Sequence, residues 1–211
     1  MHDLLREHFV ALWERINARG DPDRPYRKLV RMYRSPRRSY HTLEGHILHC
    51  LQELEEARPF TKHSDIAPGA ILYHDAVMGR GIEGCNELWS AGIAVRTFRR
   101  AGCNRTFRMN IASCILATRH WYGAGWTDGR VVMDADLAIL GQPEGVFDRY
   151  ETQIREEYAH VPLDRFQAGR TRILQQFLRN YSIYQTPYFR ERYEQSAIKN
   201  IRRSIDRLAH P

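Results

Sequence analysis

Cysteines and long apolar runs are scarce in this sequence of 211 residues. The four cysteines, Cys50, Cys85, Cys103 and Cys114, are scattered and form no CxxC pair. This excludes a zinc ribbon or a disulfide framework and predicts free thiols in a reducing compartment. No stretch approaches the roughly 18–20 apolar residues that a membrane-spanning helix needs, and the charged N-terminus lacks the apolar core of a signal peptide. We therefore expect a cytoplasmic protein with no membrane partner.

Period-2 strands, internal repeats and low-complexity tracts are also missing, whereas apolar residues recur at helical spacing along most of the chain. With 43% hydrophobic residues, the chain can bury a core without staples. We predict an all-α fold, a bundle of roughly eight to ten helices. Residues 1–211 are expected to form one domain, with the C-terminal helices (about 143–211) packed on the rest. A domain boundary near Gly141 is the alternative.

The charge balance is basic, with 32 Lys and Arg against 25 Asp and Glu, a formal net charge of +7. A basic balance favours anionic partners, either phosphorylated small molecules or nucleic acid. A solvated basic surface explains the same balance equally well, and no polybasic run is dense enough to indicate a nucleic-acid tail.

An apolar run, residues 70–77, contains the dipeptide His74-Asp75 and is expected on a helix that begins near Ser64 or Pro68. This helix is expected to stop before a glycine-rich loop, residues 78–81, at the mouth of a site built around the dipeptide. A carboxylate beside an imidazole in a buried segment is costly unless something pairs with it. A divalent metal ion is one such partner, because it takes neutral imidazole and ionised carboxylate as ligands. The alternative is a core histidine that is hydrogen-bonded to the neighbouring acid. His2-Asp3 has the same two residue types at a polar terminus, and we assign it no function.

Further ligand candidates lie on the helix expected from His41 to about Ala57. His46 and His49 are three apart and share a helix face. His41 and His46 are five apart, about 140° around an ideal helix, so both reach one ion only if the first turn is irregular. Gly45 would permit such a turn.

A second apolar run, residues 131–140, contains Asp134 and Asp136. The order of candidates is thus histidine, then His-Asp, then aspartate. Such a donor set suits a six-coordinate Mn, Co, Ni, Fe or Mg ion better than a cysteine-rich zinc site.

These segments are similar to motifs of the HD superfamily of metal-dependent phosphohydrolases, above all to a bacterial family of predicted members of about this length. The resemblance covers most of the chain, and its short motifs occur in order. They are Pro36-x-Arg38-x-Tyr40-His41-Thr42-Leu43-Glu44, Tyr73-His74-Asp75-Ala76-Val77, Asn86-Glu87-x-x-Ser90-Ala91, Ala117-Thr118-x-His120, Asp134-Ala135-Asp136-Leu137-Ala138-Ile139-Leu140-Gly141, Ile154-Arg155-x-Glu157-Tyr158-Ala159 and Phe166-x-x-Gly169-Arg170.

The resemblance implies that His41, His74, Asp75 and Asp136 bind the metal. Asp134 is then a cap or an acceptor that orients a ligand. The departure from the family pattern is Gly45, since the second histidine of this helix often follows the first more closely.

Other roles follow from charge. Asp75 is expected to orient the attacking water as well as bind the metal. His120 is expected to protonate the leaving oxygen or hold a phosphate oxygen; a helix-capping histidine is the alternative. Glu87 is expected to contact a second ion or the ligand, or else to be a surface acid. Substrate binding is assigned to Arg38, Arg155, Arg170 and His46, with structural arginines as the alternative. Tyr158 and Tyr184 are expected in the core.

The leading hypothesis is hydrolysis of a phosphomonoester or phosphodiester, with nucleotides favoured. Three alternatives stay open: a nucleotide-binding regulatory module without catalysis, a basic nucleic-acid binder with a structural metal, and a di-iron oxygenase. The last would need a second ion, for which only His46, His120 and Glu87 are available. A homo-oligomer is compatible with all of them.

Overall fold

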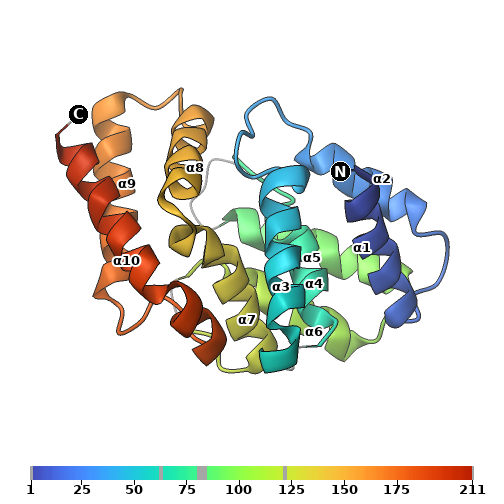
Figure 1. Ribbon diagram of the computed structural model, residues 1–211. Helices are drawn as coiled ribbons and strands as arrows, with labels where there is room; N and C mark the ends of the chain where they lie inside the picture. The colour runs from blue at the N-terminus through green and yellow to red at the C-terminus, as the bar shows by residue number, and fades with distance from the viewer. Residues whose placement is uncertain (1, 62–63, 80–84, 121–122, 211) are drawn as a thin grey trace.

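The computed structural model describes residues 2–61, 64–79, 85–120 and 123–210. Within these ranges every regular element is helical, which confirms the all-α prediction (Figure 1). The elements are α1 (His2–Arg15), α2 (Asp23–Tyr33), the π-helical turn η1 (Leu43–Ile47), α3 (Leu48–Thr61), α4 (Ile66–Tyr73), α5 (Cys85–Arg100), α6 (Arg105–Ala117), α7 (Thr127–Leu137), the 3-10 turn η2 (Ala138–Gly141), α8 (Glu144–Glu157), α9 (Leu163–Arg179) and α10 (Pro187–Ala209).

Local signals explain several helix limits. Asn104 Oδ1 accepts a hydrogen bond from the Phe107 amide at 2.8 Å and so caps α6. Gly102 adopts a φ of +80° in the turn between α5 and α6, a conformation that favours glycine. Pro187 opens α10, where its missing amide hydrogen costs nothing. One predicted limit is wrong: α4 ends at Tyr73, so His74 and Asp75 lie in the turn after the helix.

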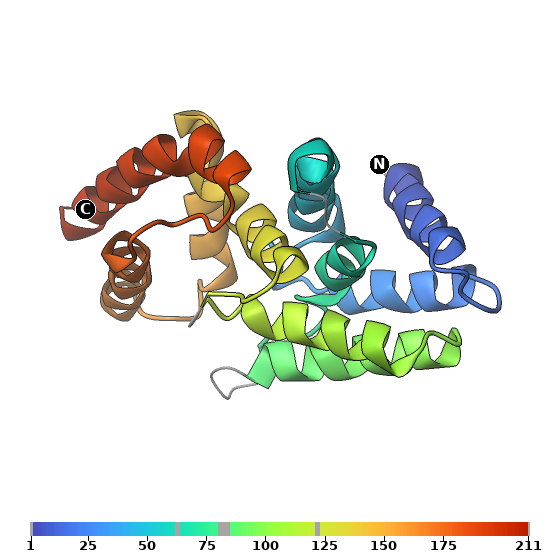
Figure 2. The same cartoon turned by 90° about the horizontal axis from the view of Figure 1, so that it is seen from below.

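Helices α3, α4 and α7 occupy the middle of the molecule, and the two termini lie at opposite ends (Figures 1 and 2). The pair α5 and α6 lies side by side beneath them, and α6 packs on α4 and α7. Helices α8, α9 and α10 form the C-terminal end. One continuous cluster of buried apolar side chains runs from α1 to α10.

The C-terminal helices are attached mainly through η2. Gly141 approaches the Tyr193 side chain of α10 so closely that a Cβ atom would collide with it. The Asn200 side chain donates hydrogen bonds to the carbonyl oxygens of Leu140 and Gln142 at 2.9 and 2.8 Å. Among the described residues, no helix combines the length and the apolar character that crossing a bilayer requires.

Candidate metal centre

An irregular turn brings His41 and His46 to the same place. The Ile47 amide donates to the Thr42 carbonyl, five residues back, at 3.1 Å, which widens the helix locally. Thr42 Oγ1 accepts from the Gly45 amide at 3.1 Å, and a Cβ on Gly45 would lie 2.9 Å from that oxygen. The ring centroids of His41 and His46 are therefore 5.4 Å apart, as the irregular first turn allows.

The turn after α4 orients His74. Its Nδ1 lies 2.8 Å from the carbonyl oxygen of Ile71. A carbonyl only accepts, so Nδ1 carries the proton and Nε2 of the neutral ring has a free lone pair. Asp75 follows directly and is the more exposed of the two residues.

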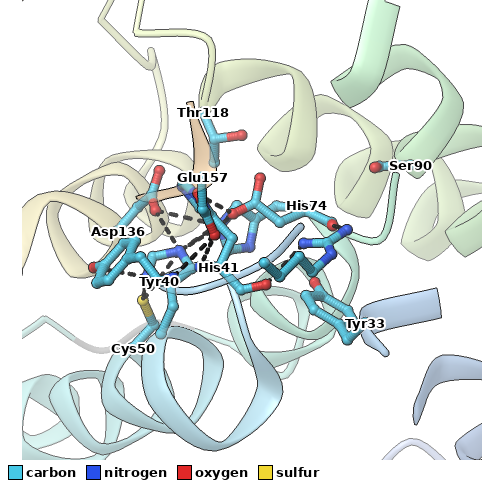
Figure 3. Close-up of polar contacts among 12 residues, drawn as sticks. Tyr33, Tyr40, His41, Cys50, His74, Ser90, Thr118, Asp136 and Glu157 are labelled. Atoms are coloured by element: carbon cyan, nitrogen blue, oxygen red, sulfur yellow. Dashed lines mark hydrogen bonds and ion pairs between the residues drawn. The ribbon is translucent and has the colours of Figure 1, made fainter. Parts of the chain in front are cut away.

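The two aspartates of α7 differ in role. Asp134 is fully buried and accepts from the Gln185 amide and from the amide and hydroxyl of Thr186, each at 2.7 Å. Asp134 therefore holds the start of α10 in place, and it does not orient a metal ligand. Asp136, two residues later, points toward the histidines (Figure 3).

Four side chains form what we call the cluster: His46, His74, Asp75 and Asp136. The two histidine Nε2 atoms are 3.0 Å apart. Asp136 Oδ1 lies 3.1 and 3.3 Å from them, and Asp75 Oδ2 lies 3.4 and 3.2 Å from them. His46, His74 and Asp136 form a group that could hold a metal ion.

The two histidines lie differently from what their predicted roles imply. His46, predicted to bind substrate, is central to it, whereas His41, predicted to bind metal, lies at its edge. His41 Nε2 is 3.9 Å from Asp75 Oδ2. His49, the third histidine of the segment, instead lies 3.8 Å from Glu53 Oε1.

The donor chemistry of the cluster fits a divalent cation. Two imidazole nitrogens that face one another at hydrogen-bond distance need a shared proton or a cation between them, because two lone pairs repel. Two carboxylate oxygens beside them supply the negative charge that balances a 2+ ion. A mixed set of imidazole and carboxylate donors suits Mn, Co, Ni or Fe, and less well Mg, which prefers oxygen.

Without a metal ion, protons on the histidines would have to balance the negative charge of the two carboxylates. Burial lowers the pKa of His74, but Asp75 and Asp136 raise it by more, so its pKa lies well above the usual 6.5. Burial also lowers the pKa of His46, which Cys50 and hydrogen bonds to the same carboxylates raise well above 6.5. Burial raises the pKa of Asp75 and Asp136, but His74 and the other imidazoles bring both pKa values well below 3.8. The metal-free cluster is thus an ion-pair network, and a metal ion would replace its protons.

Glu157, at the end of α8, holds His41. Its Oε1 accepts from the amides of Ser39, Tyr40 and His41, each at 2.9 Å. Its Oε2 lies 2.6 Å from His41 Nδ1. This carboxylate fixes the His41 tautomer and leaves Nε2 facing Asp75.

The role of Glu157 was missed from the sequence, although the residue lies in a quoted motif. The signal was available in the helical period, because the buried residues of α8 are Phe147, Tyr150, Ile154 and Glu157. A carboxylate on an apolar face needs partners. Which donors would supply them was not visible in the sequence.

His120 and Glu87 differ in their distance from the cluster. His120 Nε2 lies 2.9 Å from Asp136 Oδ2, so this histidine contacts the cluster through Asp136. Its Nδ1 is buried and has no hydrogen-bond partner among the described residues. Glu87 Oε2 instead forms an ion pair with Arg119, at 3.6 Å from its Nε.

Arg38 braces two of the site's segments. Its guanidinium donates to the carbonyl oxygens of His41 and Asp75 at 2.8 and 2.7 Å. The group lies over the Tyr33 ring, 4.7 Å from the centroid. Two of its donors are therefore used to hold backbone, not a ligand.

Arg155 and Arg170 have structural partners, contrary to the predicted phosphate contacts. Arg155 Nη1 donates to the carbonyl oxygens of Tyr158 and Val161 at 2.7 and 3.1 Å and so closes the end of α8. Arg170 is buried and paired with Glu151, and it donates to the Tyr150 hydroxyl at 2.8 Å. Neither guanidinium is bonded to the cluster.

The tyrosine prediction is half right. Tyr184 is fully buried, and its hydroxyl donates to the Leu137 carbonyl at 3.0 Å. Tyr158 is 44% exposed, because it follows the last turn of α8 and faces outward. All four cysteines are free, as expected.

No family model matches the chain, and searches of curated proteins and of solved structures returned no match. Proposals about function therefore depend on the site's geometry and on the motifs of the sequence.

Proposed function

We propose that this protein is a metal-dependent phosphohydrolase of the HD type, which hydrolyses a phosphomonoester or phosphodiester, with nucleotides favoured. The observation that carries the proposal is the cluster. Three segments far apart in the sequence bring two imidazole nitrogens together, each 3.0–3.4 Å from the other and from two carboxylate oxygens. The motif resemblance supports the same chemistry.

His46, His74, Asp75 and Asp136 would hold the ion. A divalent ion there would lower the pKa of a bound water and offset the charge that builds on the phosphoryl group. The basic balance of the chain, +7 overall, favours the approach of an anionic ester.

The neighbouring side chains would position water and move protons. Asp75, whose side chain is 27% exposed, accepts a hydrogen bond from the water and orients it. His41 Nε2 carries a proton to or from the reacting oxygens, because the contact of Nδ1 with Glu157 fixes the ring and leaves Nε2 free. His120 keeps Asp136 in place through its 2.9 Å hydrogen bond. Arg38 fixes the backbone of His41 and Asp75.

The test is elemental analysis of the purified protein, followed by a screen for phosphate and nucleoside release. The screen uses phosphomonoesters and phosphodiesters with Mn, Co, Ni, Fe and Mg tested separately. His74→Ala and Asp75→Ala should abolish release while the protein stays folded. His49→Gln is the matched control, because His49 lies three residues from His46 but points at Glu53.

Three results would count against the proposal. A folded, metal-loaded protein that turns over nothing across the panel contradicts it. Tight nucleotide binding without products would support the regulatory module instead. Nucleic-acid binding that weakens steeply with salt would support a basic nucleic-acid binder with a structural metal.

A further inference from the structure

A cavity of about 430 Å³ adjoins the cluster. Its walls come from the end of α2, the loop that follows, the turn after Asp75, helix α5 and the end of α8. Met78 and Gly79 line it, which matches their predicted place at the mouth of the site; the rest of that glycine-rich turn, Arg80 and Gly81, lies outside the described residues.

Three of the lining residues connect the cavity to the site. Arg38 donates to the carbonyl oxygens of His41 and Asp75, Glu157 binds His41 Nδ1, and Ala76 follows Asp75 in the chain. His41 and Asp75 are also the exposed side chains, each 27% exposed, whereas His46 and His74 are 2% and 1% exposed. The cavity therefore lies against the segments that carry His41 and Asp75, although none of the cluster's own side chains lines it.

The walls of the cavity combine apolar, aromatic and polar side chains, the polar ones including Ser35, Arg37 and Asn86. Tyr158 contributes a partly exposed ring, which lies 6.2 Å from the His160 ring at an interplanar angle of 20°. The Tyr158 carbonyl is held by Arg155, so the segment is fixed in place. Ile93 of α5 and Val77 also line the cavity.

These walls suit one kind of ligand. Exposed, nearly parallel rings bind a planar aromatic group by stacking. A flexible alkyl chain would lose more conformational freedom on binding than a rigid ring does.

We propose that this cavity binds a planar aromatic ring in the leaving group of the substrate, with Tyr158 as the stacking face and Ile93 on the lining. The inference depends on the proposed function for the position of the phosphoryl group at the cluster. A nucleobase and a simple aryl group share this chemistry, and the experiment below separates them.

Binding of phenylphosphonate and methylphosphonate tests the subsite without turnover. The two anions carry the same phosphonate group, so the ratio of their dissociation constants measures the contribution of the ring to binding. Calorimetry with and without Mn²⁺ should show phenylphosphonate binding roughly tenfold more tightly. Tyr158→Ala and Ile93→Trp should remove that preference, Tyr158→Phe should keep it, and Tyr181→Ala, on the fully exposed Tyr181, should not change it.

An unchanged ratio in both Tyr158→Ala and Ile93→Trp would overturn the subsite. Failure of the proposed function looks different, because the wild-type protein would then release no phosphate from any ester. For an active enzyme, KM for phenyl phosphate and for purine and pyrimidine nucleoside monophosphates, compared with methyl phosphate, identifies the source of the ring. Tyr158→Ala should raise KM for the ring-bearing esters alone.

Discussion

Glu157 Oε2 lies 2.6 Å from His41 Nδ1, although 116 residues separate them. The same carboxylate collects three consecutive backbone amides of the His41 segment. Helix α8 thus sets the orientation of a histidine from the N-terminal part of the chain (Figure 3). The C-terminal helices are therefore part of the site's construction.

Replacing Glu157 with Gln should therefore weaken both the fold and the reaction. Buried amides lose a charged acceptor, which should cost roughly 1–3 kcal/mol in the free energy of unfolding. Phosphate release should fall about 10–100-fold, as for other outer partners of a site histidine, with metal content retained. Chemical denaturation and steady-state kinetics measure the two effects.

Glu156→Gln is the control, because Glu156 is adjacent and exposed and, among the described residues of the same segment, accepts a hydrogen bond only from the Ser39 hydroxyl. It should behave like the wild type. If Glu157→Gln and Glu156→Gln have the same stability and the same rate of phosphate release, Glu157 does not position His41.

Alanine at His46 or at His41 should separate a metal ligand from a proton carrier. His46→Ala removes a central donor and should weaken metal binding at least about 100-fold, more than the loss of an outer partner does. His41→Ala should change the metal affinity by less than roughly tenfold but should strongly lower the rate of phosphate release. Titration against a chelating indicator measures the affinity. The reverse pattern would return His41 to the role that the motif resemblance implies.

Chelation should make stability fall as the pH rises. In the metal-free protein, His46 and His74 have pKa values above 6.5, so their stabilisation is complete below pH 6.5 and is lost as the pH rises through the raised values. Asp75 and Asp136 have pKa values below 3.8, so theirs is present above pH 3.8 and is lost on further acidification. Thermal unfolding in a chelator should therefore give a higher Tm near pH 5.5 than near pH 8.5.

Mn²⁺ should reverse this trend, because metal binding requires deprotonated imidazoles and strengthens as the pH rises. Asp136→Asn removes one of the two carboxylates and should flatten the dependence in the chelator. A chelated wild type whose pH profile matches that of Asp136→Asn would contradict the ion-pair network.

Gly45→Ala should destabilise the protein, because the new Cβ would lie 2.9 Å from Thr42 Oγ1. Displacement of that hydroxyl removes a cap worth about 1 kcal/mol and shifts His46, so metal affinity should fall as well. Gly169→Ala in α9 is the matched control, because no atom lies within 4 Å of its added Cβ. It should be neutral or stabilise by up to about 1 kcal/mol. Similar losses in the two variants, measured by denaturation, would show that the close approach at Gly45 is unimportant.

The sequence alone predicted most of the fold. Apolar spacing and local stop signals, such as Asn104 and Gly102, gave the helices to within a few residues, because they act between neighbours in the chain. The limit of α4 was missed because the apolar run continues past Tyr73 while the helix does not. The sequence also pointed to the segments of the site and favoured Asp136 over Asp134.

What the sequence determined, then, was which residue types are available and in which segments of the chain they lie. Only the tertiary structure decided that His46 is central and His41 peripheral, because that choice depends on one widened turn held by Thr42 and Gly45. Only the packing of segments that are distant in the sequence could show that Arg170 pairs with Tyr150 and Glu157 with His41. Helical periodicity records which face is buried, but the partner that satisfies a buried charge is set by how distant helices meet.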